Sequence, residues 1–137
     1  MAGQNEIISV DDKGALHFGN HDAVEKQKLE GFEIQGDLYK VKTHNQVTRL
    51  EKNGRLLYES VPGTTVGDFI LTEDGVRFTV QGSAEDAQIT LELDADQEFE
   101  VWANGVDLGS AKSNLAGKVN ISVDFESGLQ TIEIKKL

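Results

Sequence analysis

The sequence contains no cysteine and only one proline in 137 residues. Without cysteine, the chain can form no disulfide, no thiolate zinc site and no cysteine nucleophile. Basic residues are also scarce: 13 Lys and Arg stand against 24 Asp and Glu, which gives a formal net charge of −11. Nucleic acids and anionic membranes are bound by an excess of Lys and Arg. We therefore expect neither of them as a partner.

Long hydrophobic runs are absent as well, because no apolar stretch approaches the ~18 residues of a membrane span. Residues 1–14 show neither the basic segment nor the apolar segment of a signal peptide. We expect a cytoplasmic protein if the chain is complete and an extracellular one if it is an excised domain, so the compartment stays open. We find no linker and no repeat, and we expect a single domain spanning residues 1–137.

What the sequence does contain is alternation of apolar and polar residues. The pattern covers residues 76–80, 89–93, 99–103, 119–125 and 132–134. A period of two indicates strands with one buried face, and antiparallel sheets show it most clearly. Phe78 and Phe99 fall in phase with the apolar positions, which predicts that both lie in the core.

Three dipeptides, Asn53-Gly54, Asp74-Gly75 and Asn104-Gly105, predict tight hairpins because both residues tolerate a positive φ. Pro62-Gly63 predicts a type II turn. Counting outward from the hairpins gives the following cross-strand pairs: Leu50 with Leu57, Arg49 with Tyr58, Leu71 with Phe78, Val101 with Leu108, and Trp102 with Asp107.

Helix signals are few. Residues 22–29 alone have a helix-forming composition, and this segment could equally be an edge strand or a loop. Turn signals recur every 8–12 residues, as in sandwiches and barrels. The sequence therefore predicts an all-β fold, an antiparallel two-sheet β-sandwich of jelly-roll or Ig-like type, with about ten strands and little helix.

Side chains for catalysis or metal binding do not form a recognisable set, and we predict no catalytic residue. No serine lies in a G-x-S-x-G motif. His17 and His21 are expected to be surface residues flanking a turn, although they could converge with Asp22. The roles of His17, His21 and His44 stay open, and no metal ligand is predicted.

Asp94–Glu98 resembles the start of a calcium-binding loop, with acidic residues at alternate positions. An EF-hand requires glycine at the sixth position, where this chain has Phe99. The sequence therefore predicts no cofactor and leaves only structural calcium open.

Trp102 is out of phase with Phe99 and Val101, which predicts a position on the solvent-facing side of its strand. An exposed indole often marks a contact surface, and its flat apolar face suits a sugar ring. Asn104 and Asp107 could add hydrogen bonds beside it. Two alternatives remain: Trp102 could be covered by the N-terminal segment, or it could be covered by another chain.

Arg49 and Tyr58 form a second candidate pair, predicted to be cross-strand neighbours on the face opposite Leu50 and Leu57. They could contact a ligand as well. The alternative is that they form only a cross-strand stack.

Residues 97–137 include EFEVWANGVDLGSAKSNLAGKVNISVDF and end in GLQTIEIKKL. This stretch resembles the C-terminal β-sandwich and Ig-like accessory modules of bacterial carbohydrate-active enzymes. In those modules a strand, an Asn-Gly hairpin, a Gly-Lys stretch and a final strand recur. The resemblance implies a sugar-binding or accessory role without catalysis, with carbohydrate or a larger enzyme chain as partner.

We therefore predict a non-catalytic, carbohydrate-associated module that contacts neutral glycans through an exposed aromatic residue. The alternative is an interaction protein, either a small all-β partner subunit or a homo-oligomer. A glycan-cleaving enzyme is the third hypothesis, and it is disfavoured because no acid–base pair or nucleophile stands out.

Overall fold

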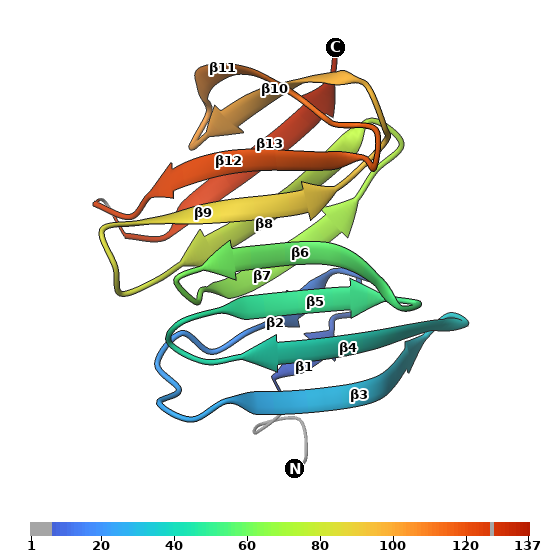
Figure 1. Cartoon of the computed structure of the whole chain (residues 1–137), viewed down its shortest axis with the longest axis vertical. Coiled ribbons are helices and arrows are strands. Elements are labelled where there is room, and N and C mark those ends of the chain that lie inside the picture. The colour runs from blue at the N-terminus through green and yellow to red at the C-terminus, as the bar shows by residue number, and fades with distance from the viewer. Residues whose placement is uncertain (1–6, 127) are drawn as a thin grey trace.

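The computed structural model describes residues 7–126 and 128–137, in which the chain forms thirteen strands and no helix. The described part accordingly holds no helix long and apolar enough to cross a membrane. Residues 1–6, where the segment examined for a signal peptide begins, lie outside the description. Two antiparallel sheets pack face to face (Figure 1), which confirms the predicted all-β sandwich.

Sheet A has seven strands in the order β1-β2-β7-β8-β13-β10-β11. Their bounds are β1 (Ile8–Val10), β2 (Leu16–Phe18), β7 (Thr65–Leu71), β8 (Gly75–Gln81), β10 (Glu98–Ala103), β11 (Val106–Lys112) and β13 (Gln130–Lys136). Sheet B has six strands in the order β12-β9-β6-β5-β4-β3. Their bounds are β3 (Gln27–Ile34), β4 (Asp37–Thr43), β5 (Thr48–Lys52), β6 (Arg55–Val61), β9 (Asp86–Glu92) and β12 (Lys118–Asp124). Figure 1 shows β1 to β5 at one end of the long axis and β10 to β13 at the other.

The core lies between the sheets and consists of the in-phase apolar residues. Phe78 and Phe99 are both buried, which confirms their predicted position. Phe78 belongs to an aromatic cluster with Phe18, Tyr58 and Phe69, in which most ring pairs meet edge to face, with centroids 5.2–6.2 Å apart. Such contacts add to the burial of apolar area. The sheets therefore have one apolar inner face and one polar outer face each.

The two Asn-Gly hairpins form as predicted, since Asn53, Gly54, Asn104 and Gly105 all have positive φ. The pairing beyond the turns differs, because each hairpin contains a β-bulge. Leu50 lies opposite Tyr58, so the predicted pairings of Leu50 with Leu57 and of Arg49 with Tyr58 are wrong.

In the second hairpin, Trp102 lies opposite Asp107 as predicted. Val101 lies opposite Gly109, so the prediction of Leu108 as its partner is wrong. A bulge inserts one extra residue into one strand and shifts every later pair.

The other turn predictions are also corrected by the structure. Leu71 pairs with Val76, so its predicted pairing with Phe78 is wrong. Backbone hydrogen bonds between Thr72 and Gly75 close the turn around Glu73-Asp74, one residue before the predicted Asp74-Gly75, and neither Asp74 nor Gly75 has a positive φ. Gly63 has no positive φ, which excludes the predicted type II turn. Residues 22–29, the helix candidate, are not helical: 22–26 form an irregular segment and 27–29 belong to β3, an edge strand of sheet B.

Candidate functional site

Trp102 lies on the outer face of sheet A, because its neighbours Val101 and Phe99 point into the core. It is half-buried and stands directly opposite Asp107 on β11 and Glu133 on β13. In the next row of the same face, Glu100 stands opposite residues of both neighbouring strands, Ser110 and Lys135. Trp102, Asp107, Glu133 and Glu100 are here called the Trp102 face, in which carboxylates on both neighbouring strands lie opposite the tryptophan.

Two carboxyl groups of the Trp102 face interact with each other. The pKa of Glu100 is raised from its ordinary value, first because its protonated carboxyl shares a hydrogen bond with Asp107. Partial desolvation and the charge of Asp107 act in the same direction. Asp107 also accepts a hydrogen bond from the backbone N–H of Gly109 at 2.7 Å, which fixes one carboxylate oxygen. The face therefore offers hydrogen-bond acceptors in defined positions beside the indole.

Asn104 lies next to this face, and its side chain is used within the fold. Its amide nitrogen donates to Gln130 Oε1 at 2.7 Å, and its amide oxygen accepts from the backbone N–H of Thr131 at 2.8 Å. These bonds tie the β10–β11 turn to the start of β13. Both polar atoms of Asn104 are thereby already engaged in the free protein.

The second predicted pair does not come together at the surface. Tyr58 is fully buried, and its hydroxyl lies 2.8 Å from Thr64 Oγ1. Arg49 remains on the outer face of sheet B, where it forms ion pairs with Glu51 at 3.3 Å and with Glu59 at 3.0 Å. The prediction of Arg49 and Tyr58 as surface neighbours is therefore wrong, because the bulge in β6 turns Tyr58 into the core.

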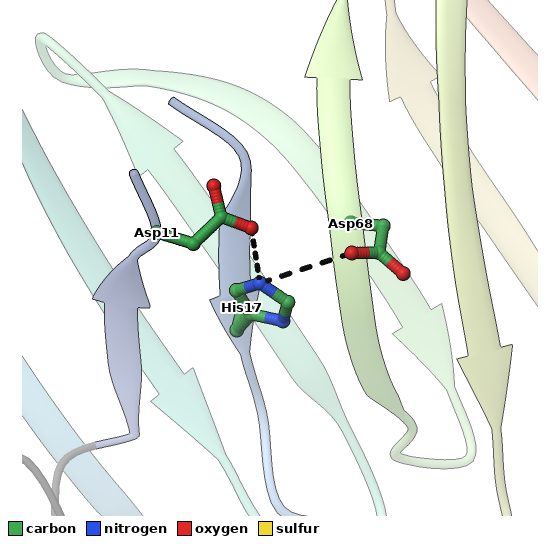
Figure 2. Close-up of side chains that lie close together, drawn as sticks. All are labelled: Asp11, His17 and Asp68. Carbon is green, nitrogen blue, oxygen red and sulfur yellow. Dashed lines mark hydrogen bonds and ion pairs between the residues drawn. The ribbon is translucent and has the colours of Figure 1, made fainter. Parts of the chain in front are cut away.

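A second cluster of polar side chains lies on the outer face of sheet A, four strands away from Trp102 in the sheet order. Figure 2 shows Asp11, His17 and Asp68 converging from the end of β1, from β2 and from β7. His17 Nε2 donates to Asp11 Oδ2 at 3.0 Å and lies 3.9 Å from Asp68 Oδ1. One ligand-type atom of each residue lies within 4.8 Å of the others. Asp11, His17 and Asp68 are here called the His17 cluster.

The local structure explains why these residues meet. β7 bulges between Gly67 and Ile70, so that Gly67 and Asp68 both lie opposite His17 rather than on opposite faces. Bulges re-aim side chains in this way and are frequent beside active sites. The bare backbone of Gly67 leaves room for the imidazole, since a Cβ there would lie 3.2 Å from His17 Nδ1.

Asp11 is held in place by its own turn. Its Oδ1 accepts hydrogen bonds from the backbone N–H of Lys13 at 2.9 Å and of Ala15 at 3.0 Å, while Oδ2 faces His17. The hydrogen bond from His17, and then that from Ala15, hold the pKa of Asp11 below its ordinary value. The cluster borders a surface hollow of about 320 Å³, whose polar lining includes Ser9, Thr65, Thr79 and Gln81.

The remaining sequence candidates lie apart from this cluster. His21 Nδ1 lies 2.7 Å from Thr65 Oγ1, and its Nε2 lies 3.5 Å from Asp22, so His17 and His21 have different carboxylate partners. In the calcium-like loop, Asp94 pairs with Lys136 and Asp96 pairs with Lys112.

Sequence reasoning treated His17 as a surface residue flanking a turn and did not find Asp11 and Asp68 as its partners. The available signal was the Gly67-Asp68 pair, since glycine inside a strand pattern often marks a bulge. Which strand would lie beside that bulge depends on the sheet order, which local patterns do not reveal.

The fold places the chain among antiparallel two-sheet β-sandwich proteins. Comparison with protein-family models, with curated proteins and with solved structures finds no match in any of the three. The arguments for function therefore depend on the chain's own chemistry.

Proposed function

We propose that this protein is a non-catalytic β-sandwich module that binds neutral saccharides on the Trp102 face. The observation that carries the proposal is a half-buried tryptophan on a solvent-facing sheet surface, with carboxylates on both neighbouring strands. A sugar ring can stack its C–H groups on the indole, while Asp107 and Glu133 accept hydrogen bonds from its hydroxyls.

The charge of the protein selects among saccharides. With a net charge of −11, and with Glu100, Asp107 and Glu133 around the indole, an acidic polysaccharide would be repelled. A neutral saccharide meets no such repulsion and supplies hydroxyl donors to the carboxylates. The resemblance of residues 97–137 to accessory modules of carbohydrate-active enzymes supports the same ligand class.

The geometry of the acids favours binding over cleavage. Glycosidases hold two carboxyl groups about 5–9.5 Å apart on either side of the scissile bond. The raised pKa of Glu100 instead reflects a hydrogen bond shared with Asp107, a closer approach than either glycosidase arrangement uses.

The test is calorimetry of the whole chain with neutral oligosaccharides chosen from a glycan array. Because a shallow site buries little area, we expect Kd on the order of 10 μM to 1 mM. Trp102→Ala should abolish detectable binding and change the free energy of unfolding by less than about 1 kcal/mol, since the side chain lies outside the core. Trp102→Phe, which keeps an aromatic face, should retain part of the affinity.

Asp107→Asn separates the roles of stacking and hydrogen bonding, because asparagine keeps an acceptor oxygen for Gly109. It should weaken binding less than Trp102→Ala does. The proposal fails if no neutral saccharide binds at millimolar concentration, or if Trp102→Ala changes the mass of the protein in solution.

A second candidate function, self-association, is favoured by the edge strand β11. Val106 is 62% exposed and Leu108 is 55% exposed on this strand. Natural edge strands are usually protected by charge, as β3 is by Lys28 and Glu30. Pairing of β11 with a second copy would cover both residues, and light scattering after size exclusion would then give a dimer that Leu108→Lys dissociates.

A further inference from the structure

We propose that the His17 cluster is a binding site for a divalent first-row transition ion, with Zn²⁺ as its representative. Asp11, His17 and Asp68 would supply one imidazole nitrogen and two carboxylate oxygens. The inference is independent of the saccharide proposal, because the two sites lie four strands apart, which is roughly 19 Å across a sheet.

The distances suit such an ion. Zinc binds histidine nitrogen and carboxylate oxygen at about 2.0–2.2 Å, so two of its tetrahedral ligands are roughly 3.4 Å apart. His17 Nε2 lies 3.0 Å from Asp11 Oδ2 and 3.9 Å from Asp68 Oδ1, on either side of that value. The side chain of Asp68 is 65% exposed and can move to close the longer distance.

The charges also favour a cation. Within residues 7–126 and 128–137, neither Asp11 nor Asp68 forms an ion pair with lysine or arginine, and both are paired only with His17. Other acids of this chain have basic partners, such as Asp94 with Lys136 and Glu92 with Arg55. Two carboxylates at one imidazole leave negative charge that a divalent ion would neutralise.

The cluster is arranged before any ion binds. Asp11 is fixed by two backbone N–H groups, and the β7 bulge with Gly67 brings Asp68 beside His17. Such support for ligating side chains is typical of metal sites. With the metal on Nε2, a neutral imidazole carries its proton on Nδ1, so the Nε2–H bond to Asp11 is replaced by two bonds to the metal.

The ligand set selects the type of ion. One nitrogen and two oxygens suit zinc or a similar transition ion, whereas calcium takes six to eight oxygens. Three protein ligands leave a coordination position open. Water or a small oxygen ligand can occupy that position.

The experiment is calorimetric titration of the whole chain with Zn²⁺, alongside Ca²⁺ at the same concentration. We expect one Zn²⁺ per chain and no matching event with Ca²⁺. Asp68→Asn should weaken Zn²⁺ binding at least about tenfold, because it removes a charged ligand. Asparagine tolerates the positive φ of 49° at this position, so the variant should fold.

His17→Gln should abolish the one-to-one binding, and His44→Gln is the matched control that should bind like the unmodified chain. Imidazole ¹⁵N NMR gives a second readout, in which Zn²⁺ should shift Nε2 of His17 and leave His44 unchanged. Trp102→Ala should keep Zn²⁺ binding intact, so that failure of the saccharide proposal is distinguishable. Absence of binding at millimolar Zn²⁺, or equal binding by all the variants, would overturn the inference.

Discussion

Tyr58 joins the aromatic core to a group of buried hydroxyls. Its hydroxyl lies 2.8 Å from Thr64 Oγ1, which in turn lies 2.7 Å from Ser60 Oγ. Thr48 Oγ1 donates to the carbonyl oxygen of Thr64 at 2.8 Å and lies 2.7 Å from Thr43 Oγ1. All five residues are fully buried, and no described buried side-chain polar atom lacks a partner. Thr64 therefore makes hydrogen bonds with three of the other four residues, and the buried hydroxyls depend on it for their partners.

Thr64→Val keeps the side-chain shape and removes the hydroxyl between Tyr58 and Ser60. Because the Tyr58 hydroxyl would be left buried without this partner, we expect a loss of about 1–3 kcal/mol in the free energy of unfolding. Urea unfolding followed by fluorescence measures it. Thr131→Val is the matched control, since Thr131 is exposed, and it should cost less than about 0.5 kcal/mol. Equal costs for the two variants would mean that the network contributes nothing.

At the level of the strand and its turn, the β10–β11 hairpin depends on Asn104 in two ways. Its φ of 53° is unfavourable for most residues, and its side chain bonds Gln130 and Thr131 on β13. Asn104→Gly keeps the left-handed turn and loses the side-chain bonds. Asn104→Ala loses both, so it should be less stable than the glycine variant by about 1–2 kcal/mol.

Thermal unfolding of the two Asn104 variants measures this difference. Asn104→Gly itself should be less stable than the unmodified chain by about 1 kcal/mol, through the lost hydrogen bonds. If alanine and glycine destabilise equally, the left-handed backbone at this turn is not a source of strain.

The elements that the sequence predicts are those set by local chemistry. Both Asn-Gly turns and the alternation through Phe78 and Phe99 follow from preferences of a few neighbouring residues. The segment 22–29 shows the limit of this reasoning, because its last three residues pair with β4 and its composition does not produce a helix.

Bulges account for most of the errors in register and in the candidate site. Leu57 and Tyr58 are adjacent and both buried, which no period-two pattern anticipates. The same kind of irregularity in β7 places Asp68 beside His17. Trp102 lies beside a bulge as well, but the extra residue of that bulge is in β11, and β10 itself pairs with β13 without interruption. Its position on the outer face was therefore predictable from phase alone.

At the scale of the whole molecule, sheet A is completed by the last strand of the chain. β13 lies between β8 and β10 and pairs with both of them. Ile132 and Ile134 on this strand are buried in the core. The half of the sheet that holds the His17 cluster is therefore joined to the half that holds Trp102 through β13.

Deletion of residues 130–137 should consequently abolish the folded state rather than trim one end of it. The deletion leaves β8 paired only with β7 and β10 paired only with β11, so the sheet is cut between them. It also removes two buried isoleucines, of which each alone should cost about 2–5 kcal/mol when replaced by alanine. These losses together approach the 5–15 kcal/mol that stabilises a typical domain. Circular dichroism against temperature should then show no cooperative transition.

Deletion of Leu137 alone is the control, because this residue is 70% exposed and follows the strand. A synthetic peptide of residues 130–137 should restore cooperative unfolding by occupying the gap, whereas a truncated chain that unfolds cooperatively by itself would show that the two halves of sheet A are stable separately.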